Sequence, residues 1–170
     1  NKKMVNPEHK KFLEWCKKNV KELKVVEKKH YLAPKGQINP YHFVKVLFDN
    51  LSPLTQIITG DGTAAVVTFK AAKLKEGQRL YTNKGCASMG YDLPALLGAL
   101  YAKSPLEKIL ITGDGSIMMN LQELSSFRPF AKEDIKIFVL NNKGYHSIRQ
   151  SQNNYFGGFE VGCGENSNLF

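Results

Sequence analysis

The sequence contains few cysteines and no long hydrophobic run, and both absences narrow its class. Its three cysteines, Cys16, Cys86 and Cys163, lie far apart and include no Cys-x-x-Cys pair. This spacing favours a reduced protein over a disulfide-stapled domain or a zinc site. No apolar run of about 18 residues occurs, and no apolar signal core follows the lysine-rich first residues. We therefore expect a cytoplasmic protein with no membrane partner, in which Cys86 packs as a small apolar residue.

Acidic residues are also scarce, and the formal net charge is +9. Most of the excess lies in residues 1–36, which contain eleven lysines and four glutamates, whereas the remaining chain has 13 basic and 11 acidic residues. Lysines separate apolar residues at helical spacing, namely Phe12, Cys16, Val20 and Leu23. We interpret this segment as a helix with a solvated basic face. A nucleic-acid-binding patch is the alternative, but no zinc finger, RNA-binding signature or basic repeat supports it. We expect no nucleic-acid partner.

The rest of the chain alternates apolar strands with helical stretches. Strands are predicted at residues 56–59, 79–82, 108–112 and 135–140, and helices near 41–51, 64–73, 92–103 and 117–128. The alternation predicts a mostly parallel sheet covered by helices on both faces, which is a three-layer α/β/α sandwich. The last two strands are the most apolar, so we expect them at the centre of the sheet.

Two local patterns divide the chain. Asn39 is a typical helix N-cap, and Pro40 suits the first helical turn. The residues before them, 30–36, are predicted to be an extended linker. We therefore expect residues 1–37 to be a basic helix and linker from a preceding domain, and residues 38–170 to form the main domain.

Ligands of open α/β sheets bind outside the carboxyl ends of the strands. The four loops expected at that edge are residues 60–63, 83–89, 113–116 and 141–144. The loop Gly113-Asp114-Gly115-Ser116 is followed by a helix predicted to start near Ile117, and amides at a helix start form an anion site suited to a diphosphate. A bound diphosphate usually brings Mg²⁺, which takes oxygen ligands. Asp114, an amide oxygen of the Asn141-Asn142 pair and the carbonyl of Gly144 could supply them.

The spacing of these motifs matters more than either motif alone. Gly-Asp-Gly is a common turn, and a second copy at Gly60-Asp61-Gly62 has no Asn-Asn pair at the corresponding distance. After the copy at Gly113-Asp114-Gly115, 25 residues, 116–140, precede Asn141. That length accommodates one helix and one strand, so both loops are expected side by side at the same edge of the sheet.

Gly-Asp-Gly, about 25 residues and then Asn-Asn resembles the signature of the thiamine-diphosphate enzymes. The resemblance extends over most of residues 38–170. Gly-Cys-Ala-Ser-Met-Gly-Tyr-Asp-Leu-Pro-Ala at 85–95, Met-Met-Asn-Leu-Gln-Glu-Leu at 118–124 and the lysine-rich lead-in are similar to the acetolactate synthase branch. Gly-Tyr-His-Ser-Ile-Arg-Gln at 144–150 is similar to acetolactate-synthase-like proteins of surface-polysaccharide pathways. The resemblance implies the thiamine-diphosphate-binding fold, with thiamine diphosphate and Mg²⁺ as cofactors.

The resemblance also assigns roles to individual positions. Asp114, Asn142 and the carbonyl of Gly144 would hold Mg²⁺. The diphosphate would be held by the loop that Gly113 opens, through the amides of Gly115 and Ser116.

The remaining cofactor contacts come from two other loops. Met89 would be the apolar wedge under the cofactor, although a methionine in isolation is more often a core gap-filler, and the carbonyl of Ala87 would bind the pyrimidine amine. The loop after the first strand departs from the branch pattern, because a glutamine and a histidine are usual there. Here Thr63 can replace one contact and nothing replaces the other. His146 is a candidate catalytic residue, with a structural role as the alternative.

The resemblance predicts decarboxylation of a 2-keto acid, with pyruvate the first candidate, followed by transfer of the two-carbon unit to an acceptor. The alternatives are a simple 2-keto acid decarboxylase and a non-catalytic phosphate-binding module. In the family, a glutamate from a separate pyrimidine-binding domain, usually of the neighbouring subunit, activates the cofactor, and we find no candidate domain in this chain. We therefore expect these 170 residues to be inactive alone and C-terminally incomplete, and the full-length protein to be a homodimer or larger oligomer.

Overall fold

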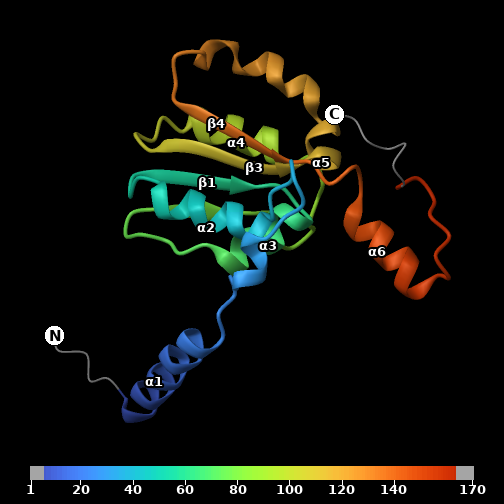
Figure 1. The fold of residues 1–170 in the computed structure, drawn as a ribbon. Coiled ribbons are helices and arrows are strands. Elements are labelled where there is room, and N and C mark those ends of the chain that lie inside the picture. The colour runs from blue at the N-terminus through green and yellow to red at the C-terminus, as the bar shows by residue number, and fades with distance from the viewer. Residues whose placement is uncertain (1–5, 164–170) are drawn as a thin grey trace.

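The computed structural model describes residues 6–163 (Figure 1). Its α-helices are α1 (Pro7–Glu22), α2 (Pro40–Asn50), α3 (Thr63–Ala71), α4 (Asp92–Tyr101), α5 (Asp114–Met118) and α6 (His146–Tyr155). Two 3-10 helices are η1 (Lys28–Tyr31) and η2 (Leu121–Phe130). The strands are β1 (Thr55–Thr59), β2 (Arg79–Tyr81), β3 (Glu107–Gly113) and β4 (Ile135–Leu140).

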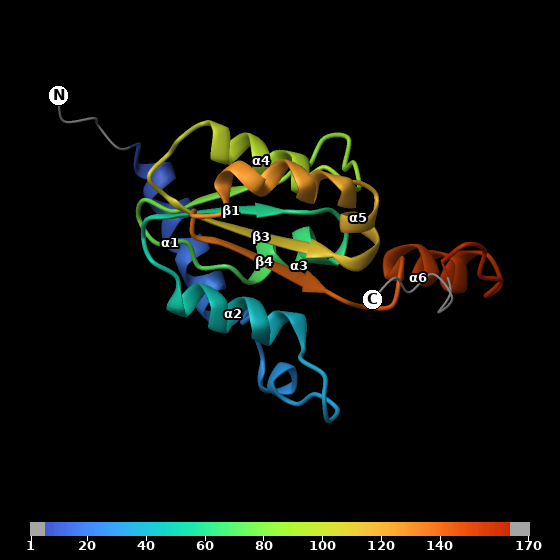
Figure 2. The ribbon, with the colours of Figure 1, turned by 90° about the horizontal axis from the view of Figure 1, so that it is seen from above.

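The four strands form one parallel sheet in the order β2-β1-β3-β4. Successive residues of a strand point to opposite faces, so Ile109 and Ile111 pack with α2 and α3, whereas Leu110 packs with α4 and α5. Figure 2 shows the two helical layers on opposite sides of the sheet. The predicted three-layer α/β/α sandwich is confirmed, and its strand ends meet at one edge.

The predicted central position of the last two strands is correct for β3 and wrong for β4. Every residue of β3 from 108 to 112 is buried. Within the described sheet, β4 is an edge strand, and its Lys136 and Val139 are exposed. Its apolar sequence has another cause: Phe138 packs on the α2–α3 side and Ile137 on the α4 side, so both faces are covered although one edge is open.

The helix predicted at residues 117–128 is also different in the structure. α5 starts three residues earlier, at Asp114, and ends at Met118. Asn120 then leaves helical geometry, with φ −135° and ψ 35°, and a 3-10 helix follows. The side chain of Asn120 bonds the carbonyl of Gly90, so a tertiary contact accompanies the break. The helix start consequently coincides with the Gly-Asp-Gly loop itself.

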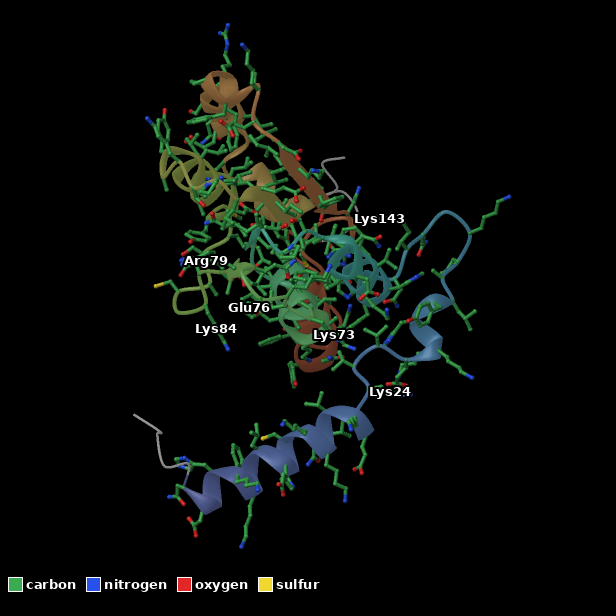
Figure 3. The ribbon with its side chains drawn as sticks, turned by 90° about the vertical axis from the view of Figure 1, so that its left-hand side faces the viewer. Lys24, Lys73, Glu76, Arg79, Lys84 and Lys143 are labelled. Atoms are coloured by element: carbon green, nitrogen blue, oxygen red, sulfur yellow. The ribbon has the colours of Figure 1, made fainter. Side chains whose placement is uncertain are left out.

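The segment before the sheet is helical as predicted, but its apolar side is open. Figures 1 and 3 show α1 set apart from the sheet. Phe12 is 65% exposed and Val20 is 75% exposed. The predicted extended linker is wrong at its start, because His30 and Tyr31 belong to η1, where the His30 ring stacks on Tyr41 with centroids 4.8 Å apart.

The start of α2 follows the prediction, since Asn39 Oδ1 accepts the Tyr41 N–H at 2.9 Å. Cys86, in contrast, is exposed rather than packed. It lies in the loop between β2 and α4. Among the helices of residues 6–163, none is both long and apolar enough to cross a membrane.

Candidate cofactor site

One cavity of about 260 Å³ lies at the carboxyl edge of the sheet and takes residues from all four predicted loops. It brings together every residue to which the resemblance gave a role: Thr63, Ala87, Met89, Gly113, Asp114, Gly115, Ser116, Asn142, Gly144 and His146. Asp61, Tyr145 and Ile148, to which sequence reasoning gave no role, also line it. α6 lies beyond the ends of β3 and β4 and forms one side of this region (Figure 2).

Asp114 joins the two loops that the Gly-Asp-Gly and Asn-Asn motifs define. Its side chain is 1% exposed. One carboxylate oxygen, Oδ2, accepts the Gly144 N–H at 2.6 Å, and Oδ1 accepts the Asn142 N–H at 3.4 Å. A carboxylate has about four lone-pair sites. Asp114 therefore holds the second loop in place and still has acceptor capacity for a cation.

Asn142 provides a buried acceptor that nothing in the described chain satisfies. Its Oδ1 atom has no hydrogen-bond donor among residues 6–163. Leaving a buried polar atom unpaired typically costs about 1–3 kcal/mol, so such atoms are uncommon without a functional reason. The carbonyl of Gly144 accepts the His146 N–H at 3.1 Å and retains a second lone pair.

These oxygens are of the type that Mg²⁺ takes in proteins: a carboxylate, a side-chain amide and a backbone carbonyl. The orphaned Asn142 oxygen is the specific feature that a bound cation would explain. Within residues 6–163, no group of three or more histidine, cysteine or acidic side chains could form a different metal centre. The residues present therefore fit Mg²⁺.

The start of α5 forms the neighbouring part of the cavity. Gly113 is the N-cap, so Gly115 and Ser116 lie in the first turn, where backbone N–H groups have no intrahelical acceptor. A Cβ at Gly113 would meet nothing within 4 Å, whereas one at Gly115 would lie 2.6 Å from Cε1 of Tyr145. One glycine thus leaves open space, and the other allows the tyrosine ring to approach the backbone.

The loop with Ala87 and Met89 is fastened to this helix. The Gly90 N–H donates to Ser116 Oγ at 3.0 Å, and Asn120 Nδ2 donates to the Gly90 carbonyl at 2.7 Å. Ala87 has φ 51°, a left-handed conformation that costs a non-glycine residue about 1–2 kcal/mol. Sequence reasoning assigned no role to Asn120, because its contact joins elements 30 residues apart.

The remaining predicted residues reach the cavity from the first turns of two helices. Thr63 is the first residue of α3 and His146 the first of α6, and the His146 side chain is exposed. Asp61 precedes Thr63 on the same loop and adds a second carboxylate to the cavity lining.

Comparison with known proteins identifies the family. The model of the thiamine pyrophosphate enzyme C-terminal TPP-binding domain matches residues 59–169. The chain belongs to this family. The match begins in β1 and includes all four loops of the cavity, so thiamine diphosphate is the ligand class of the domain.

Curated relatives narrow the branch. This chain is 34% identical over 140 residues to the acetolactate synthase large subunit of Buchnera aphidicola (strain APS), covering 82% of this chain and 24% of the relative. It is 35% identical over 104 residues to the isozyme 1 large subunit of Escherichia coli K12, covering 59% and 18%. The chain spans about a quarter or less of these relatives. It is an acetolactate-synthase-like thiamine-diphosphate-binding domain.

A solved structure supports the fold. The thiamine-diphosphate-dependent 4-hydroxybenzoylformate decarboxylase of Rhodococcus jostii RHA1 matches with a TM-score of 0.65 and 19% identity, over 78% of this chain and 25% of that one. At this identity the match establishes the shared architecture of the domain.

Proposed function

We propose that this domain is the magnesium- and thiamine-diphosphate-binding part of an enzyme that decarboxylates a 2-keto acid and transfers the remaining unit to an acceptor. One observation carries the proposal: the buried Asn142 Oδ1 has no donor in residues 6–163, and it lines the same cavity as the Asp114 carboxylate. The identity to acetolactate synthase large subunits supports the reaction type and favours pyruvate as the first substrate to test.

Mg²⁺ would be held by the Asp114 carboxylate, Asn142 Oδ1 and the Gly144 carbonyl. The bonds from Asp114 to the Asn142 and Gly144 amides support this assignment, because they fix the second loop relative to the first before any cation binds. Preorganised ligands need no rearrangement when the ion arrives, which favours binding.

Thiamine diphosphate would be held along the rest of the cavity. The first-turn amides of Gly115 and Ser116 suit its diphosphate, and Thr63 offers a hydroxyl from the opposite loop. Ala87 and Met89 both line the cavity, and the Ala87 carbonyl and the Met89 side chain would contact the rings. When bound, thiamine diphosphate supplies the carbanion stabilisation that 2-keto acid decarboxylation requires.

The chain's own contribution to the reaction is binding, orientation and proton transfer. Met89 and Ile148 contribute apolar residues to the cavity lining. His146 is at the cavity surface and would exchange a proton with the substrate. The described residues that line the cavity include no glutamate, so we infer that the activating glutamate comes from another domain, in a cytoplasmic homodimer or larger oligomer of the full-length protein.

The test uses the full-length protein with thiamine diphosphate, Mg²⁺ and pyruvate, measuring carbon dioxide and identifying the carbon product. Acetolactate would support the carboligase, and carbon dioxide with acetaldehyde would indicate a simple decarboxylase. Magnesium-dependent cofactor binding without pyruvate turnover would point to a different keto acid. Absence of cofactor binding would overturn the proposal.

A matched pair of variants ties the activity to the site. Asp114→Ala should abolish turnover, because it removes a proposed ligand and the acceptor of two loop amides. Asp134→Ala is the control, since Asp134 is exposed at the opposite end of the sheet, before β4. Equal activity of both variants would contradict the assignment.

A further inference from the structure

The geometry points to Arg149 as a positioning residue that fixes residues 141–144, here called the magnesium loop, and couples this loop to the segment after α6. This inference rests on the proposed function, because it concerns the loop that would hold Mg²⁺. Arg149 lies in the first turn of α6, and its backbone N–H donates to the Tyr145 carbonyl at 3.0 Å. Its side chain reaches back over the loop that precedes the helix.

The guanidinium group contacts the loop through backbone carbonyls. Nη2 donates to the Asn142 carbonyl at 2.8 Å, and Nη1 donates to the Lys143 carbonyl. The rigid, planar fork of an arginine can bridge two such acceptors at once. A lysine ammonium is a single point charge on a flexible stem and matches this arrangement less well.

The loop needs such support because its backbone is unusual. Lys143 has φ 63° and Gly144 has φ 98°, so two successive residues are in left-handed conformations. Lysine adopts this region rarely. Asn142 and Gly144, the residues on either side of Lys143 in this turn, both line the cavity, so a more relaxed loop would move both proposed magnesium ligands together.

Asp114 and Arg149 hold this loop from complementary sides. The Asp114 carboxylate accepts the N–H groups of Asn142 and Gly144. The Arg149 guanidinium donates to the carbonyls of Asn142 and Lys143. An acidic side chain therefore accepts from the N–H groups of this turn, and a basic side chain donates to its carbonyl groups. Of these two side chains, only that of Asp114 is a proposed magnesium ligand.

Arg149 also contacts the segment that follows α6. Nη1 donates to the Cys163 carbonyl at 3.0 Å. Residue 163 is 1% exposed, and Gln152 Oε1 accepts the Val161 N–H at 3.0 Å from the same helix. A displacement of residues 161–163 would therefore be transmitted to the magnesium loop by the Arg149 guanidinium group, which contacts both segments.

The test measures Mg²⁺ binding to the full-length protein by calorimetry at saturating thiamine diphosphate. Arg149→Met should raise the Kd for Mg²⁺ about 10–100-fold, the usual effect of losing a residue that orients a metal ligand. Arg149→Lys should give an intermediate Kd, because it keeps the charge and loses the fork. Arg128→Met is the matched control, since Arg128 is exposed on η2, and it should bind Mg²⁺ like the wild type.

Hydrogen exchange in the absence of cofactor separates this inference from the proposed function. The amides of Asn142 and Gly144 should exchange faster in Arg149→Met and Arg149→Lys than in the wild type and Arg128→Met. Wild-type exchange and wild-type Kd in both Arg149 variants would overturn the inference while leaving the proposed function intact. If Arg149→Met does not fold, the lysine variant decides. Failure of the wild type to bind Mg²⁺ would overturn the proposed function and the metal role of the loop, and the exchange data would still decide whether Arg149 holds that loop.

Discussion

Each end of β3 has a buried charged side chain, and the two side chains differ in how far away in the sequence their hydrogen-bond partners lie. Lys108 lies at the start of the strand and is 4% exposed, and Asp114 lies directly after its end and is 1% exposed. The Lys108 ammonium donates to the carbonyls of Ser104 and Leu106, in the turn that leads into the same strand. This charge is satisfied locally, by groups only two and four residues away.

At the carboxyl end of β3, the hydrogen-bond partners are distant in the sequence, and one buried acceptor has no partner among the described residues. Asp114 bonds amides 28 and 30 residues away, and the nearby Asn142 Oδ1 has no partner in the described chain. Two of the non-glycine residues with positive φ, Ala87 and Lys143, belong to the loops at this edge. The difference indicates that the amino end of the strand is built for stability and the carboxyl end for a ligand.

The largest expected effect comes from replacing Asn142 by the similarly shaped leucine. If Asn142 Oδ1 binds Mg²⁺, Asn142→Leu should weaken magnesium-dependent cofactor binding about 100-fold, which corresponds to about 2.7 kcal/mol. Because an unpaired buried acceptor is removed, the cofactor-free protein should be as stable as the wild type or more stable. Calorimetric titration and thermal unfolding measure the two quantities. A loss of stability without a loss of affinity would mean that Asn142 is a structural residue and would reverse the comparison.

Lys108→Met should give the opposite pattern. The variant leaves the Ser104 and Leu106 carbonyls without their donor, so we expect a loss of about 2 kcal/mol in the free energy of unfolding. Affinity for thiamine diphosphate should not change, since Lys108 is at the far end of the strand. Urea unfolding and cofactor titration of the full-length protein check both parts. Weaker cofactor binding at wild-type stability would contradict the division between the two ends.

The difference between the ends also separates what the sequence could predict from what it could not. The strands and the meeting of the four loops follow from apolar periodicity and from the 25-residue spacing between Ser116 and Asn141. These are properties of continuous segments. The cavity accordingly contains every residue to which the resemblance gave a role.

Contacts between distant segments were beyond that reasoning. The early end of α5, the Asn120–Gly90 bond and the Arg149 contacts each depend on where another element lies. Likewise, the apolar residues of β4 are typical of a central strand, and only the packing shows helices on both faces of an edge strand. Local pattern predicts which elements form, but long side chains that bond backbone carbonyls across elements leave no periodic signal.

The two glycines of the Gly113-Asp114-Gly115 loop allow effects on stability to be separated from effects on cofactor binding at the carboxyl end of β3. Gly115→Ala should destabilise the cofactor-free protein by about 1 kcal/mol, because the new methyl group displaces the Tyr145 ring. Gly113→Ala should leave that stability unchanged, since its methyl group meets nothing within 4 Å and its φ of −98° suits any residue. In the cofactor titration, Gly113→Ala should bind more weakly, because it adds a group to the cavity lining. If both variants lose only stability, the space beside Gly113 is not used by the ligand.

The smallest expected effect concerns the exposed charges at the amino end of the sheet. Asp134, and after it Glu107, bond the Lys136 ammonium and raise its pKa above the ordinary value of 10.5. A raised pKa in the folded protein means that the stabilisation is complete below the unfolded pKa and is lost as the pH rises through the folded value. The wild type should therefore be slightly more stable than Lys136→Met at pH 8, and this difference should be smaller at a pH above 10.5. Urea unfolding at both pH values measures it, and a difference that does not change with pH would assign the effect to the packing of the lysine stem on β4. Either way the cofactor affinity should stay constant, because these charges satisfy one another at the end of the sheet that we assign to stability.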